Sequence, residues 1–193
     1  MPELPTIGVE PALKPAAASS QTHHVGVLGT RGTVSSRRFE RLRREHAEGT
    51  HFSVQACDGL ARAIEQSTEE PLPATAANAK IRALCARYTG ALGPFGLKTG
   101  EIDTLVLGCT HYVFAKDVLR ALVGPEVQLI DTGAAVARQT RRILAQAGAL
   151  APETEGASGR IALYTTGPLR ALEAAAQRWL DLPAHCCAAL PPD

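Results

Sequence analysis

Short apolar runs alternate along the chain with longer stretches in which apolar residues recur at helical spacing. This alternation is typical of βαβ units, in which helices connect parallel strands. Several runs are apolar throughout, as expected of strands that are covered on both faces. The pattern predicts an α/β fold with strands at Thr6–Val9, Val25–Leu28, Phe52–Gln55, Thr104–Leu107, Val127–Ile130 and Arg160–Tyr164.

The segments between these strands are predicted to be helices, because their apolar residues share one helical face. The last of them, Pro168–Leu180, begins with proline at the first helical position, where proline is favoured, and its apolar stripe is expected to face the core. Two glycine-containing stretches, Gly90–Gly100 and Gly148–Gly159, are predicted loops. The other predicted helices are Thr33–Arg44, Gly59–Gln66, Thr75–Tyr88, Phe114–Leu122 and Ala134–Ala147.

The composition indicates a globular chain and excludes several classes of function. The 193 residues are 45% apolar and 20% charged, enough to bury the core of one or two domains. A net charge of +1 gives no general attraction to nucleic acid or to an anionic membrane, and the arginines of residues 37–44 alternate with glutamates as on a solvated helix face. Neither a membrane span nor a signal peptide is apparent, so we expect a cytoplasmic protein.

The five cysteines are irregularly spaced. An odd number of thiols in an expected reducing compartment does not favour a disulfide framework. Cys57 and Cys85 are expected to be small core residues. Cys186 and Cys187 follow His185 near a proline-rich terminus, where we expect a frayed tail and no metal site.

The strongest chemical signal is the run Asp103-Thr-Leu-Val-Leu-Gly-Cys-Thr-His-Tyr112, in which Cys109, Thr110 and His111 directly follow an apolar strand. Open α/β folds bind ligands at this edge, and the N-terminus of a following helix lowers the pKa of a nearby thiol. In a functional interpretation, Cys109 performs proton transfer or covalent chemistry, His111 tunes or carries its proton and Thr110 binds an anionic group. In a structural interpretation, the cysteine ends the strand and His111 caps the next helix. The residue types alone leave both open.

A second candidate is the strand, turn and helix of Gly26–Ser36, which contains Thr30 and Thr33. Its glycines are spaced G-x-x-G-x-x-G and do not match the dinucleotide-binding fingerprint. The turn is either an anion site at a helix start or an ordinary helix cap. Glu65, late in the helix Gly59–Gln66, is by itself an ordinary surface charge.

Four segments in order resemble glutamate racemases of the aspartate/glutamate racemase superfamily: Gly8–Ala16, Thr30–Ser35, Thr104–Tyr112 and Ile130–Gln139. The resemblance runs from about Pro5 to Leu180. Its most specific element is Gly-Cys-Thr-His-Tyr, although Val113 replaces the proline that usually follows.

The resemblance implies interconversion of L- and D-glutamate without a cofactor, supplying D-glutamate for peptidoglycan. In that family two cysteines on opposite faces of Cα remove and return the α-proton. Cys109 is similar to the second of these cysteines. His111 and Glu65 are similar to residues that assist catalysis in the family. Three further residues are similar to positions that bind the substrate: Thr30, Thr33 and Thr110. Family members often form dimers, so a homodimer is also an expectation.

The chain departs from the family pattern at its start. The Asp-Ser-Gly element, the Tyr-Gly loop and the Cys-Asn-Thr-Ala motif with the first catalytic cysteine do not occur. The resemblance therefore implies one complete parallel-sheet α/β domain at residues 1–128 and the C-terminal part of a second domain at residues 129–193. It also implies an N-terminally truncated racemase that is inactive alone. The alternatives are a single-cysteine superfamily enzyme, such as a decarboxylase, and a non-catalytic binding remnant.

Overall fold

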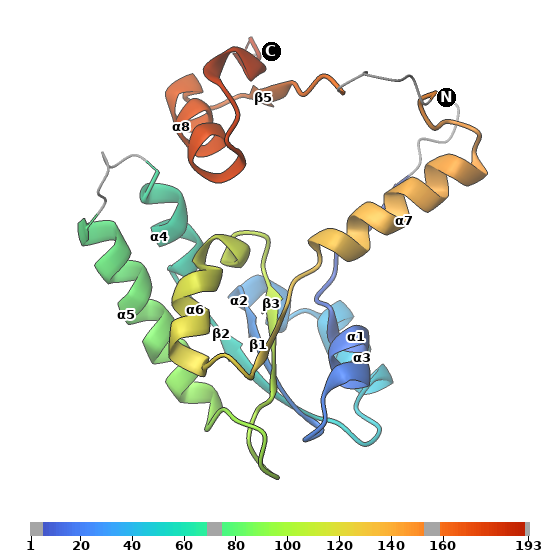
Figure 1. Cartoon of the computed structure of the whole chain (residues 1–193), viewed down its shortest axis with the longest axis vertical. Coiled ribbons are helices and arrows are strands. Elements are labelled where there is room, and N and C mark those ends of the chain that lie inside the picture. The colour runs from blue at the N-terminus through green and yellow to red at the C-terminus, as the bar shows by residue number, and fades with distance from the viewer. Residues whose placement is uncertain (1–5, 69–74, 153–158, 192–193) are drawn as a thin grey trace.

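The computed structural model describes residues 6–68, 75–152 and 159–191. Its centre is a four-stranded sheet in which each strand runs parallel to its neighbours (Figure 1). All four strands lie where the apolar runs predict them, which confirms the parallel α/β prediction. In spatial order they are β2 (His51–Ala56), β1 (His24–Gly29), β3 (Thr104–Gly108) and β4 (Gln128–Ile130).

Both faces of the sheet are covered. Alternate residues of its central strands point to opposite sides, and a buried cluster lies on each side. Val25 and Val27 of β1 join one buried cluster, and Leu28 of β1 joins another together with Leu105 of β3. This explains why the two central strands, β1 and β3, are largely apolar. The first cluster is completed by α1 (Leu13–Ser19) and α3 (Arg37–Glu45), and the second by α4 (Leu60–Gln66), α5 (Thr75–Leu92) and α6 (Lys116–Val123) (Figure 1).

The carboxyl ends of β1 and β3 lie level with each other, because Gly29 pairs with Gly108. The two backbones approach closely here: a Cβ atom on Gly108 would lie 2.7 Å from the carbonyl oxygen of Leu28. A Cβ atom on Gly29 would lie 2.6 Å from a methyl group of Val34, in the short helix α2 (Arg31–Val34). Glycine at both positions therefore lets the segments that follow the two strands meet at one edge of the sheet.

A smaller unit follows the central sheet. The connecting helix α7 (Gly133–Gln146) has no buried residue. Beyond it, β5 (Leu163–Thr165) and β6 (Cys187–Ala189) form a parallel pair beside α8 (Leu169–Leu180) and the short 3₁₀ helix η2 (Ala184–Cys186) (Figure 1). In the described residues, no helix combines the length and the apolar character needed to cross a bilayer.

Two predictions for the N-terminal half were wrong. Residues 6–9 form no strand, and the side chain of Val9 is 51% exposed, so this segment is not covered as a central strand would be. The predicted helix Thr33–Arg44 is instead divided between α2 and α3. The division falls at Ser36, whose extended backbone ends the first helix and whose Oγ accepts a hydrogen bond of 3.1 Å from the Phe39 N–H as the N-cap of the second.

The C-terminal predictions also required correction. The segment expected to be a frayed tail forms η2 and β6, and the preceding strand covers Leu163–Thr165 in place of Arg160–Tyr164. The apolar stripe of α8 is only partly covered: Ala176 is buried, whereas Leu180 is 55% exposed. The predicted loop Gly148–Gly159 falls partly outside the described residues.

The buried carboxylate of Asp103 fastens the start of β3 to the segment that enters β1. Its two oxygens accept hydrogen bonds from Ser20 Oγ at 2.6 Å and from the backbone N–H groups of Gln21 and Thr22 at 2.5 and 2.8 Å. Thr104 Oγ1 also donates to it, at 2.9 Å. Burial on its own raises the pKa of Asp103, but these hydrogen bonds outweigh burial and hold the pKa below its usual value.

We expect Asp103→Ala to lower the free energy of unfolding by about 3 kcal/mol at neutral pH, because it leaves buried donors without an acceptor. Since the pKa of Asp103 is lower in the folded than in the unfolded chain, its contribution is present above the unfolded pKa, about 4, and is lost as the pH falls through the folded value. Urea unfolding measured from neutral to acid pH tests this. The exposed Glu126→Ala is the matched control, and equal stability of the two variants at neutral pH would contradict the assignment.

Candidate active site

An open cleft of about 370 Å³ lies at the carboxyl edge of β1 and β3, where the sequence predicted a ligand site. Five of the six predicted site residues contribute to its wall, and the sixth, Glu65, reaches it through His111. His111 and Glu65 also line a neighbouring cavity of about 530 Å³ between α4 and α8. The lining residues of the first cleft are Val9, Glu10, Pro11, Thr30, Thr33, Ala61, Gly108, Cys109, Thr110, His111 and Thr132.

The turn that carries Cys109 is fixed at both ends. Gly108 is paired within the sheet, and Tyr112, which begins the 3₁₀ helix η1 (Tyr112–Ala115), is fully buried. The Tyr112 N–H donates to the Cys109 carbonyl at 3.1 Å, and its hydroxyl donates to the Cys57 carbonyl at 3.4 Å. The thiol, hydroxyl and imidazole between these anchors therefore emerge from a rigid base.

Cys109, His111 and Glu65 form a chain of polar contacts. The Cys109 Sγ lies 3.7 Å from His111 Nδ1, and His111 Nε2 lies 2.8 Å from Glu65 Oε1. A neutral imidazole that donates its Nε2 proton to the carboxylate presents Nδ1 as an acceptor to the thiol. The arrangement thus connects a thiol to a base, and that base to a carboxylate that orients it.

The environment of Cys109 differs from the sequence expectation in one respect. Burial raises the pKa of the Cys109 thiol, and the negative charge of Glu65 raises it further. The backbone N–H groups of His111 and Tyr112 oppose this but do not outweigh it. The expected lowering was wrong, because the loss of solvation raises the pKa by more than these N–H groups lower it. Near neutral pH the thiol is therefore mainly protonated and depends on a base.

Thr30 and Thr33 act together as a helix cap. Thr30 Oγ1 accepts a hydrogen bond of 3.3 Å from the Thr33 N–H, and the two hydroxyl oxygens lie 2.9 Å apart. The cap interpretation of this turn is confirmed. Both residues line the same cleft as Thr110, so their hydroxyl groups are available to a polar ligand.

The sequence pattern did not indicate two of the polar residues that line the cleft. Glu10 and Thr132 both line the cleft, and each belongs to a segment that carries the family resemblance. Those segments alone could have indicated them, because neither residue has a motif of its own. In the described part of the chain, no cluster of three or more His, Cys, Asp or Glu side chains could hold a metal ion.

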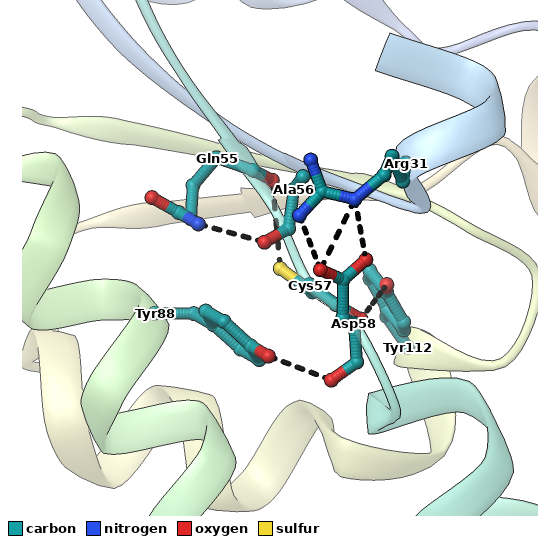
Figure 2. A network of polar contacts seen from close by, with 7 residues as sticks. All are labelled: Arg31, Gln55, Ala56, Cys57, Asp58, Tyr88 and Tyr112. Atoms are coloured by element: carbon teal, nitrogen blue, oxygen red, sulfur yellow. Dashed lines mark hydrogen bonds and ion pairs between the residues drawn. The ribbon is translucent and has the colours of Figure 1, made fainter. Parts of the chain in front are cut away.

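A polar network joins α2 to the segment that precedes α4 (Figure 2). Arg31 of α2 forms a bidentate ion pair with Asp58, with both carboxylate oxygens 3.1 Å from Arg31 Nε. The hydroxyl of Tyr88, from α5, donates to the Asp58 carbonyl at 2.6 Å. Because Asp58 lies just before α4, the network joins the helix start that holds Thr30 to the helix that carries Glu65.

Comparison with known proteins identifies relatives of the chain. Residues 2–140 match the family model described as Asp/Glu/Hydantoin racemase. The chain is 43% identical over 161 residues to a glutamate racemase of Herpetosiphon aurantiacus, covering 83% of this chain and 58% of the relative. A glutamate racemase of Ectopseudomonas mendocina is 41% identical over 173 residues, covering 90% and 60%.

Solved structures show the same similarity. Escherichia coli glutamate racemase, in complex with L-glutamate and the activator UDP-MurNAc-Ala, matches with a TM-score of 0.67 and 27% identity, over 91% of this chain and 62% of that one. A glutamate racemase isoform from Bacillus anthracis matches with a TM-score of 0.71 and 25% identity, over 94% and 61%. The chain thus spans about 60% of the length of these relatives. On this agreement of sequence and fold, the chain belongs to the Asp/Glu/Hydantoin racemase family.

Proposed function

We propose that this chain carries one half of the proton-transfer site of a glutamate racemase, with Cys109 as the thiol that exchanges the α-proton of glutamate. The observation that carries the proposal is the Cys109–His111–Glu65 chain of contacts on the wall of the cleft. The relatives named glutamate racemases, and the bound L-glutamate of the Escherichia coli enzyme, support glutamate as the substrate.

The proposed mechanism follows from the protonation of the thiol. His111 Nδ1 accepts the Cys109 proton, and the resulting thiolate removes the proton from Cα of the substrate. Glu65 orients the imidazole and stabilises its positive charge. Thr30 and Thr110 line the same cleft, and their hydroxyl groups are assigned to the polar groups of glutamate.

Inversion requires a second acid on the opposite face of Cα. Among the described residues that line the cleft, Cys109 is the only cysteine. We therefore propose that the 193-residue chain by itself exchanges the α-proton of one enantiomer and does not racemise glutamate. On this proposal residues 1–128 form the domain that holds the half-site, residues 129–193 belong to the second domain, and the family role is supply of D-glutamate for peptidoglycan in the cytoplasm.

The presence of one cysteine, Cys109, among the described lining residues of the cleft also favours a second candidate. This is a decarboxylase-like enzyme that protonates a carbanion from one face. That reaction needs one proton donor only, and a thiol that is mainly protonated is suited to it. Release of carbon dioxide from a substituted malonate, without proton exchange at glutamate, would favour this candidate over the racemase half-site.

The first test is deuterium exchange at Cα of glutamate in heavy water, followed by proton NMR. We expect exchange of one enantiomer without inversion, and at least about a 100-fold loss of rate in Cys109→Ala, because general acid–base groups contribute on that scale. Cys186→Ala is the matched control and should exchange normally. Absence of exchange would contradict the proposed function, whereas full interconversion by this chain would contradict the half-site.

The reactivity of Cys109 should depend on pH in a way that reports its surroundings. We expect its alkylation by iodoacetamide to reach half-maximal rate above about pH 8.5, the ordinary thiol value, since burial raises its pKa. Glu65→Gln should move the profile to lower pH because it removes a nearby negative charge. Peptide mass spectrometry measures the modification, and Glu48→Gln, on the exposed surface, should leave the profile unchanged. A shift of equal size in both variants would refute this account.

Binding can be measured apart from catalysis. We expect D- or L-glutamate to raise the unfolding midpoint. A ligand present at a hundred times its dissociation constant adds about 2.7 kcal/mol to the free energy of unfolding. Thr110→Ala should reduce this stabilisation, because its hydroxyl faces the cleft. Thr99→Ala, in an exposed turn before β3, is the control. Identical ligand responses in the two variants would remove Thr110 from the binding site.

A further inference from the structure

The order of groups at the edge of β3 is suited to a second kind of chemistry. A thiol, an imidazole within reach of it and a carboxylate that orients the imidazole are the three parts of a nucleophilic acyl-transfer site. We propose that Cys109 is also a nucleophile that accepts the acyl group of small activated esters and thioesters. In this reaction His111 is the proton carrier, and Glu65 is a positioning residue. The inference does not depend on glutamate as a substrate.

The geometry assigns a separate task to each ring nitrogen of His111. Nε2 faces Glu65 Oε1 at 2.8 Å, and Nδ1 faces the Cys109 Sγ at 3.7 Å. An Nε2 proton donated to the carboxylate leaves the lone pair of Nδ1 directed at the thiol. Proton transfer within hydrogen-bond contact then generates the thiolate at the moment of attack, which suits a thiol that is protonated at rest.

The surroundings of the sulfur support a charged nucleophile and leave room for a small acyl group. The backbone N–H groups of His111 and Tyr112 lower the pKa of the Cys109 thiol, because they stabilise negative charge on its sulfur. The sulfur borders an open cleft of about 370 Å³, so an acetyl or propionyl ester can approach it from solvent. By contrast, Cys57 and Cys85 are fully enclosed in the core, where burial raises their pKa values to about 12 and about 11.

The proposed reaction is balanced in two steps. In the first, the Cys109 proton moves to His111 Nδ1, the sulfur forms a bond to the carbonyl carbon and the ester C–O bond breaks. The proton on His111 then passes to the leaving oxygen. In the second step, His111 takes a proton from water, the water oxygen attacks the thioester carbon and the C–S bond breaks. That proton returns to the sulfur, and the products are an acid and an alcohol.

The test uses p-nitrophenyl acetate and the full chain. We expect a burst of p-nitrophenolate equal to one equivalent of protein, with an acetyl group found on Cys109 by peptide mass spectrometry. Cys109→Ala should show no burst, and His111→Ala should slow it by about 100-fold. Cys186→Ala should behave as the unchanged chain. A burst that persists in Cys109→Ala, or acetylation spread equally over the exposed thiols, would overturn the proposal.

A second measurement separates proton transfer by His111 from a purely structural role. Added imidazole should restore the burst rate of His111→Ala, because free imidazole can occupy the space and carry the proton. Without added imidazole, the burst rate of His111→Ala should rise with pH in proportion to the thiolate fraction of Cys109. It should lack the faster burst that His111 gives the unchanged chain near neutral pH. If His111→Ala and His111→Gln fold, as judged by circular dichroism, and still react at the normal rate, His111 is not the proton carrier. The glutamate exchange assay on the same preparations distinguishes this failure from failure of the proposed function.

Discussion

The close parallel contact between β1 and β3 is the constraint on which the site depends. Gly29 pairs with Gly108, and a side chain at Gly108 would lie within 2.7 Å of a backbone oxygen of the neighbouring strand. Because no side chain separates the strands at this point, the segments that follow them emerge side by side. The hydroxyl groups after β1 and the thiol after β3 consequently share one cleft, although nearly 80 residues separate Thr30 from Cys109 in the sequence.

The sequence was sufficient where a structural element is determined by its own residues. The four apolar strands, the buried Cys57 and Cys85 and the placement of Cys109 at the ligand edge all follow from local pattern and from the rules of parallel sheets. It was insufficient where the outcome depends on a distant partner. Residues 6–9 are apolar enough for a strand but form none, whereas the last segment forms β6 because β5 lies next to it. The pKa of Cys109 is a similar case, because burial by distant residues raises it and no local motif reveals that burial.

Burial raises the pKa of Cys57, Cys85 and Cys109, but only Cys109 has a base beside it in the described structure. The thiols of Cys57 and Cys85 lose solvent without gaining a base in the described structure, and their pKa values rise to about 12 and about 11. Cys109 loses part of its solvent but gains His111 Nδ1 at 3.7 Å, so the proton that burial retains on sulfur has an acceptor. Both proposed reactions, proton transfer at carbon and attack on a carbonyl group, therefore rely on the neighbouring base and not on a lowered thiol pKa.

The position of Glu65 determines whether that base is correctly oriented, and Glu65 is itself an exposed residue near the end of α4. Its side chain is 60% exposed, so contacts of its own do not fix it. The helix is held instead from both ends. Tyr88 and Arg31 bind Asp58 before its start (Figure 2). Arg178 of α8 donates to the Ser67 carbonyl at its C-cap. The stacked rings of Phe114 and Trp179, 4.7 Å apart, bring the same helix α8 against η1, which follows His111. The C-terminal unit thus braces both members of the His111–Glu65 pair. A displacement of α8 would therefore change their 2.8 Å contact.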